Sequence, residues 1–352
     1  VSGSAMQRFS IFSMGVSPYI TASIIIQLMQ MDIVPKFVEW SKQGEVGRRK
    51  LNQATRYMTL VLGFAQSMAL TAGFNMFTQY GFVPNPNAQT FILIGVILTT
   101  GTMFVTWLGE QITEKGIGNG VSMIIFAGII SRLPVDIKGL IEDYFINIEA
   151  SKIWQSAIFM VLLVIAVLAI VTFVTYFQQA ERKIPIQYTK RVAGAPTSSY
   201  LPLKVNAAGV IPVIFASSFI TTPSAILQAF GNYEGEVWFE TVQTLFNYNT
   251  VPGAILYTVL IVAFTFFYAF VQVNPEKLAE NLQKQGSYIP SVRPGKGTED
   301  YVSGVLMRLS TVGALFLGLV ALLPILAQML WNLPRSIGLG GTSLLIAVGV
   351  AL

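Results

Sequence analysis

Long apolar runs constrain the fold of this chain more than any other feature of its sequence. Of its 352 residues, 53% are hydrophobic and only 11% are charged. A helical run of about 20 apolar residues matches the thickness of the hydrocarbon core of a bilayer. Such runs lie at residues 11–31, 57–77, 89–109, 120–133, 153–177, 207–229, 251–273, 308–331 and 341–352. The sequence therefore predicts an all-α polytopic membrane protein with these nine runs as its spans.

The positions of lysine and arginine predict the orientation of these spans. Residues 32–56, 178–206 and 274–308 are rich in Lys and Arg, and the short loop 110–119 holds Lys115. Residues 78–88 and 230–250 contain neither, and residues 132–152 offset their basic side chains with acidic ones. By the positive-inside rule the basic loops are cytoplasmic. They alternate with the other loops across all nine spans, which supports the span count.

Two internal repeats predict how the spans are related. The pattern G-V-x-P-x-I-x-A-S occurs at Gly15–Ser23 and again at Gly209–Ser217, and G-x-S-x-x-I occurs at Gly120–Ile125 and at Gly341–Ile346. The two copies of each pattern lie five spans apart, so they cross the membrane in opposite directions. We therefore predict two five-helix halves of inverted topology. The first helix of the first half and the end of the last helix are expected to be absent from this chain.

The sequence argues against catalysis. Cysteine and histidine are both absent, which excludes thiol nucleophiles, Cys/His metal sites and histidine proton relays. The acidic residues lie in loops or at the ends of spans, and no nucleotide-binding motif is present. We predict no enzyme activity, no cofactor and no metal.

Two other membrane functions remain as alternatives. An inverted-repeat secondary transporter of a small solute fits the topology, but it needs a buried charge pair or an unwound ion site, and the sequence indicates neither. An intramembrane protease needs an Asp pair or a Ser/His pair, and the sequence offers neither. The long basic loops either fix the topology or also dock a large, partly anionic partner.

Symmetry marks a set of β-branched residues as a candidate constriction. The long repeat makes Ile20 equivalent to Ile214, and the short repeat makes Ile125 equivalent to Ile346. Val16 lies one helical turn before Ile20 on the same face. A ring of such side chains would seal against ions and part for a larger solute. For any one of these residues ordinary helix packing is the better explanation, and only their equivalent positions favour the ring.

The chain resembles a known family, the SecY proteins, which are the central subunits of bacterial protein-translocation channels. The resemblance rests on long runs: Gly15–Gln27 (GVSPYITASIIIQ), Gln43–Lys50 (QGEVGRRK), Trp107–Ser122 (WLGEQITEKGIGNGVS), Leu201–Ser217 (LPLKVNAAGVIPVIFAS), Val273–Leu282 (VNPEKLAENL), Tyr288–Gly295 (YIPSVRPG) and Gly340–Ile346 (GGTSLLI). It implies a ten-helix clamshell whose first helix is absent here. Residues 192–200 depart from the family pattern, because they are short and uncharged, so partner contacts are not carried over to them.

The resemblance also implies a domain organisation. Residues 1–10 would be a remnant of the plug that closes the channel. Residues 11–133 would form the N-terminal half, residues 134–152 an external hinge loop and residues 153–352 the C-terminal half.

The resemblance assigns three groups of site residues. The pore ring would be Val16, Ile20, Ile125, Ile214 and Ile346. The lateral gate toward lipid would be Ser17, Thr21, Gln27, Asn206, Ser218 and Thr222. The cytoplasmic residues that bind partners would be Arg182, Lys183, Lys284, Arg293 and Lys296.

The function implied is a channel that moves unfolded secretory polypeptides across the bacterial plasma membrane and releases transmembrane segments sideways into lipid. The implied partners are SecE, SecG, the SecA ATPase, the ribosome, signal sequences and the unfolded substrate, together with the lipid bilayer. No direct binding of DNA is expected.

Overall fold

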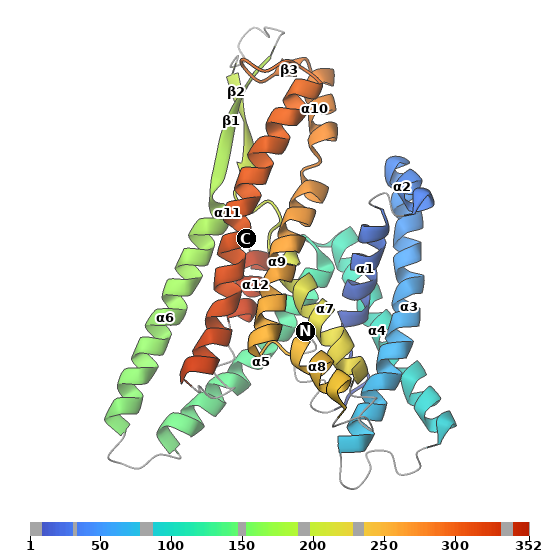
Figure 1. Ribbon diagram of the computed structural model, residues 1–352, viewed down its shortest axis with the longest axis vertical. Coiled ribbons are helices and arrows are strands. Elements are labelled where there is room, and N and C mark those ends of the chain that lie inside the picture. Colours follow the sequence, from blue (N-terminus) through green and yellow to red (C-terminus); the bar gives the residue numbers. More distant parts are fainter. Residues whose placement is uncertain are drawn as a thin grey trace. The chain divides into compact units, whose positions relative to one another are not determined.

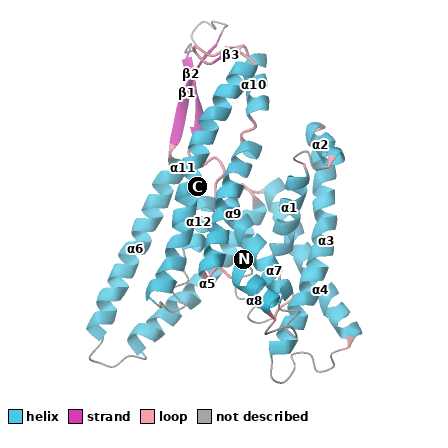
Figure 2. Cartoon of the chain, in the orientation of Figure 1, coloured by secondary structure: helices cyan, strands magenta, loops and turns pink. Residues whose placement is uncertain are grey.

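The chain is built almost entirely of helices. The structure, a computed structural model, describes residues 9–30, 34–77, 87–146, 153–188, 198–227, 236–331 and 341–351 (Figure 1). Every predicted span contains a helix, and one small sheet accompanies the helices (Figure 2). In the described residues, five helical segments are long and apolar enough to cross a bilayer. The prediction of a polytopic helical membrane protein is confirmed.

The helices fall into two compact units, residues 1–139 with 214–257 and residues 140–213 with 258–352. The first unit holds all or most of α1 (Ser17–Met29), α2 (Pro35–Lys42), α3 (Gly44–Phe77), α4 (Ala88–Lys115), α5 (Gly120–Ile141), α7 (Ile211–Leu227) and α8 (Val237–Leu245). The second unit holds all or most of the π-helix η2 (Glu142–Ile146), α6 (Ile153–Gln179), β1 (Glu181–Tyr188), β2 (Ser198–Lys204), α9 (Val251–Gln272), α10 (Pro275–Lys284), β3 (Ser287–Tyr288), α11 (Lys296–Trp331) and α12 (Gly341–Ala351).

These units are defined by packing, whereas the predicted halves at 11–133 and 153–352 are defined by the repeat. The halves, the hinge at 134–152 and the plug remnant at 1–10 therefore remain predictions. Residues 1–8 of that remnant, and most of the uncharged segment 192–200, lie outside the described residues.

The long repeat has the same local structure in both copies. Gly15 has φ 53° and Gly209 has φ 64°, and a helix begins two residues after each of them. A left-handed residue cannot be part of a right-handed helix, and glycine adopts that conformation without steric cost. The helices α1 and α7 thus begin later than the predicted spans at 11–31 and 207–229. With 13 residues, α1 is about 20 Å long, which is shorter than the bilayer core is thick.

The short repeat also marks two helix starts. Both α5 and α12 begin at the glycine of the pattern, Gly120 and Gly341. The predicted end of the fourth span at residue 133 is too early, because α5 continues through Pro134 to Ile141 and into η2. A proline removes one backbone N–H but does not always end a membrane helix, since neighbouring groups can satisfy the carbonyl that it frees.

Small residues let α3 and α4 approach closely in the first unit. The hydroxyl of Ser67 donates to the carbonyl oxygen of Gly95 over 3.1 Å. Gly63 faces Thr99 of α4 and Pro18 of α1, and a methyl group added to Gly101 would overlap the carbonyl of Ile11. Lipid gives helices little hydrophobic reason to associate, so close packing at glycine and interhelical hydrogen bonds hold such a unit together.

A three-stranded antiparallel sheet in the order β2-β1-β3 corrects the expectation of simple basic loops at 178–206 and 274–308. In β1, Ile184 and Ile186 are buried while Pro185 between them is exposed. This alternation places both isoleucines on one face of the sheet. They form a hydrophobic core with Leu203 of β2 and with residues of α10 and α11. The sheet gives these loops a fixed shape.

We expect Gly209→Ala to lower the stability of the protein by about 1–2 kcal/mol, because alanine is strained at the left-handed φ. A Cβ at Gly209 would meet no atom within 4 Å, so the backbone conformation alone is tested. The control is Gly304→Ala, in an exposed part of α11 where a Cβ is equally free. The measurement is the thermal unfolding midpoint in detergent. An unchanged midpoint for Gly209→Ala would contradict the assignment.

Candidate pore ring and lateral gate

All five residues predicted for the pore ring are buried. Four lie in the first unit, and Ile346 lies in the second. Val16 is the residue just before α1, and Ile20 lies one turn after it. Both side chains are almost wholly inaccessible to solvent. A sealing ring and an ordinary core both require burial, so the ring remains a prediction. The members of the ring are Val16, Ile20, Ile125, Ile214 and Ile346.

The structure brings two predicted gate residues together. The hydroxyl oxygens of Thr21 on α1 and Thr222 on α7 lie 3.3 Å apart. Thr222 donates to the carbonyl oxygen of Ser218 over 2.8 Å, and Thr21 lies 3.2 Å from the carbonyl oxygen of Ser17. Thr21 and Thr222 thus form the polar contact between the two helices, and the backbone carbonyls of Ser17 and Ser218 hold the two hydroxyls from within their own helices.

Gln66 of α3 completes this contact and was not predicted from the sequence. Its Nε2 donates to the hydroxyl oxygen of Thr222 over 3.3 Å, and the residue is 4% exposed. An amide in the middle of the apolar run 57–77 was the available signal. A buried amide needs a partner, and its partner Thr222 lies 156 residues away along the chain.

The other two gate residues lie in different units. Gln27 of the first unit donates from Nε2 to the hydroxyl of Ser23 over 3.2 Å. Asn206 of the second unit donates from Nδ2 to the carbonyl oxygen of Gly209 over 3.0 Å and so closes the turn that leads into α7. Among the described residues, neither amide oxygen has a hydrogen-bond partner, although both are buried. Their assignment to the gate stays a prediction.

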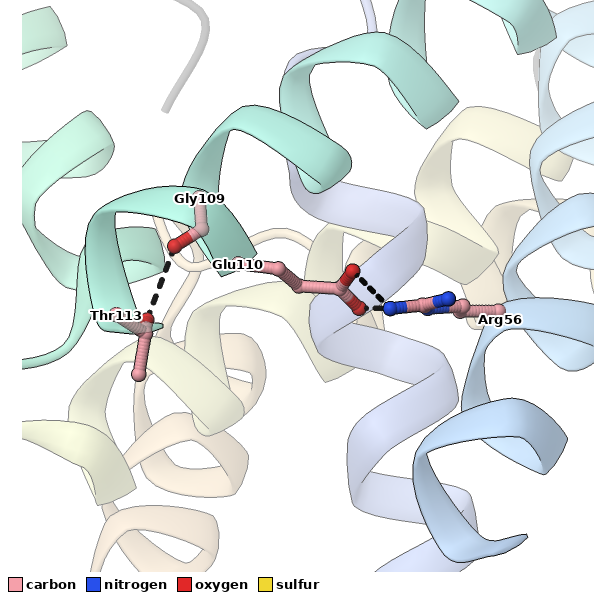
Figure 3. Close-up of polar contacts among 4 residues, drawn as sticks. All are labelled: Arg56, Gly109, Glu110 and Thr113. Carbon is pink, nitrogen blue, oxygen red and sulfur yellow. Dashed lines mark hydrogen bonds and ion pairs between the residues drawn. The ribbon is translucent and has the colours of Figure 1, made fainter. Parts of the chain in front are cut away.

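An ion pair between α3 and α4 was also missed. Figure 3 shows Arg56 facing the carboxylate of Glu110. The Nε of Arg56 donates to one carboxylate oxygen over 2.9 Å, and Nη2 donates to the other. The Glu110 side chain is 18% exposed and that of Arg56 is 50% exposed. The pair is half exposed and so leaves the expectation of no buried charge pair in place, but its contact between two helices was missed because both residues were assigned to loops.

The basic residues predicted to bind partners gather at the sheet of the second unit. Arg182 and Lys183 lie on β1, and Lys284 ends α10. All five predicted side chains are exposed. Lys183 pairs with Glu181 at 3.5 Å, and Lys284 pairs with Glu280 at 2.7 Å. The remaining two, Arg293 and Lys296, lie before and at the start of α11.

The sequence of this chain matches that of a known protein family over nearly its whole length. The SecY family model matches residues 10–352. Protein translocase subunit SecY of Lactococcus lactis subsp. cremoris is 63% identical over 354 residues, covering 100% of this chain and 81% of the relative. Protein translocase subunit SecY of Bacillus subtilis (strain 168) is 52% identical over 355 residues, covering 99% of this chain and 81% of the relative.

Solved structures share the fold at low sequence identity. A SecY structure in which the plug domain stabilises the closed state of the translocation channel has a TM-score of 0.71 at 18% identity, over 99% of this chain and 83% of its own. A protein-conducting channel has a TM-score of 0.67 at 18% identity, over 97% and 79%. Sec61 in the canine ribosome-channel complex has a TM-score of 0.64 at 17% identity, over 97% and 79%.

We expect Thr222→Val to destabilise the first unit by about 1 kcal/mol, because valine keeps the shape of threonine but leaves the buried amide of Gln66 without its acceptor. The matched control is Thr221→Val on the same helix, whose exposed hydroxyl bonds only to carbonyls of its own helix. Thermal unfolding in detergent measures both. Equal midpoints for the two variants would show that the contact between Gln66 and Thr222 contributes nothing.

Proposed function

The chain belongs to the SecY family, and from this premise we propose that it forms a channel through which unfolded secretory polypeptides cross the membrane. Substrate passes through the ring of Val16, Ile20, Ile125, Ile214 and Ile346. Transmembrane segments leave sideways between α1 and α7.

One observation carries this proposal, which is the contact between the two helices of the long repeat. Each helix begins two residues after a left-handed glycine, carries a buried ring candidate in its first turn and meets the other through Thr21 and Thr222. A neutral hydrogen bond of this kind contributes only about 0.5–1.5 kcal/mol. Moving an apolar segment into lipid gains about 0.8 kcal/mol per buried CH₂ group. A signal sequence therefore has enough free energy to part this contact.

The secondary-transporter alternative is not favoured. Its strongest support would be the Arg56 and Glu110 pair, since a transporter places ionisable groups within the membrane. Both carboxylate oxygens of Glu110 already accept hydrogen bonds from Arg56, which leaves this group poorly suited to bind a coupling ion. The relatives above 50% identity are protein translocase subunits.

We place the channel in the bacterial plasma membrane and assign it no catalytic activity. Its sequence holds no nucleotide-binding motif, so energy for transport comes from partners. The expected partners are SecE, SecG, the SecA ATPase, the ribosome and signal sequences. The exposed basic residues on the sheet and before α11 supply a positive surface for the two large cytoplasmic partners.

The ring is tested by resting ion conductance in planar bilayers. We expect Asn or Gly in place of Ile20, Ile125, Ile214 or Ile346 to raise this conductance, because a polar or missing side chain lets water and ions enter the constriction. The matched control is Ile26→Asn, a buried residue of α1 on a different face from Ile20. If every ring variant stays as tight as the wild type, the sealing role is wrong.

Arg293 is tested by charge reversal. We expect Arg293→Glu to reduce ATP-driven translocation into reconstituted vesicles while the protein stays folded, because the side chain is exposed and the bond from Thr298 goes to its backbone oxygen. The control is Arg132→Glu, an exposed position on the predicted external side. Normal translocation by Arg293→Glu would remove this residue from the partner surface.

A further inference from the structure

The Arg56 and Glu110 pair joins α3 to α4 at the residue that follows the apolar run 89–109 of α4. Glu110 lies in a helical segment that is long and apolar enough to span a bilayer, and its side chain is mostly buried. An ionised carboxylate is unfavourable there unless it is paired and hydrogen-bonded. The planar guanidinium satisfies both oxygens at once, and this two-bond geometry allows one relative position of α3 and α4.

This pair lies beside the helix that carries two ring residues. Gly63 of α3 faces Pro18 of α1, next to the ring candidates Val16 and Ile20. Arg56 is seven residues nearer the predicted cytoplasmic end of α3, which is about 10 Å along the helix. The phenol of Tyr19 on α1 lies close enough to interact electrostatically with both Glu110 and Arg56. The pair therefore lies on the cytoplasmic side of the ring, against α1.

The turn of α4 that contains Glu110 also contacts the start of α5, the helix that carries Ile125. The N–H of Gly120 donates to the hydroxyl of Thr113 over 2.8 Å. That hydroxyl donates to the carbonyl oxygen of Gly109 over 2.9 Å, as Figure 3 shows. A methyl group added to Gly120 would overlap this carbonyl. The beginning of α5 is thus fixed against the residues on both sides of Glu110.

We propose that Arg56 and Glu110 are positioning residues that hold α1 and α5 in the arrangement that seals the ring. The turn from Gly109 to Thr113 joins α3 through the ion pair and α5 through backbone contacts, and α1 packs on α3 and α4 beside it. Neither charged group needs to touch the translocating chain. The inference rests on the proposed channel function and adds a residue pair that controls its closed state.

The test compares resting ion conductance of the reconstituted full channel complex. Arg56→Gln and Glu110→Gln each break the charge pair, and the double variant Arg56→Glu with Glu110→Arg restores it in reverse. We expect each single variant to raise the resting conductance about tenfold, equivalent to ~1.4 kcal/mol between closed and open states. The reversed pair returns the conductance toward the wild-type value.

A matched control removes another ion pair of the first unit. Arg132 and Asp136 form a pair of nearly the same exposure, 49% and 18%, but both belong to α5, so the pair joins no two helices. Arg132→Gln with Asp136→Asn is expected to leave conductance unchanged. Arg56→Lys keeps the charge but cannot donate two parallel hydrogen bonds to the carboxylate, and Glu110→Asp shortens the side chain by one methylene. These two carry the test if the glutamine variants do not accumulate, and we expect a smaller rise from them.

Two results would overturn the proposal. One is wild-type conductance in all four single variants. The other is a rise that follows the loss of thermal stability and is not reversed by the charge swap, which would reflect a general structural role. The variant Ile20→Asn is measured alongside: a leak from it without one from the pair variants rejects the positioning role alone, whereas no leak from either rejects the proposed ring as well.

Discussion

The need to satisfy every backbone N–H and C=O inside a bilayer governs this structure. Lipid offers no hydrogen bonds, so a chain that crosses it forms helices, and irregular backbone is tolerated only where protein or water covers it. The two copies of the long repeat depart from regular helix at one place each, the left-handed glycines Gly15 and Gly209. The turns before α1 bond among themselves, as in the N–H of Gly15 donating to the carbonyl of Phe12 over 2.9 Å. These internal bonds satisfy part of the backbone that lies outside the regular helices.

Polar groups within the helices divide into a weak set and a strong set. The contact between α1 and α7 uses neutral hydroxyls and one amide, which water or a substrate can replace at small cost. The contact between α3 and α4 uses a two-bond ion pair together with glycines that bring the backbones close. In the proposed channel, the first contact lies in the gate that parts, and the second lies in the frame that holds its shape.

The sheet of the second unit carries basic residues on a backbone of defined shape. A flexible basic loop loses conformational freedom when it binds a partner. Here Ile184, Ile186 and Leu203 pack with residues of α10 and α11, so the basic side chains on the other positions of β1 are held in place before any partner arrives. Fixed charges of this kind favour specific docking over loose attraction.

The sequence by itself determined the membrane class, the nine spans, the inverted repeat and the family, because apolar length, glycine, proline and charge position act locally along the chain. Tertiary packing sets the length of α1 and forms strands within two of the basic loops. It also brings Gln66, Arg56 and Glu110 to their partners. The partner of Arg56 lies 54 residues away, and the threonines that meet between α1 and α7 are 201 residues apart. A polar residue in an apolar run indicates that a hydrogen-bond partner is needed. The sequence does not identify that partner, because only folding brings it within hydrogen-bond distance.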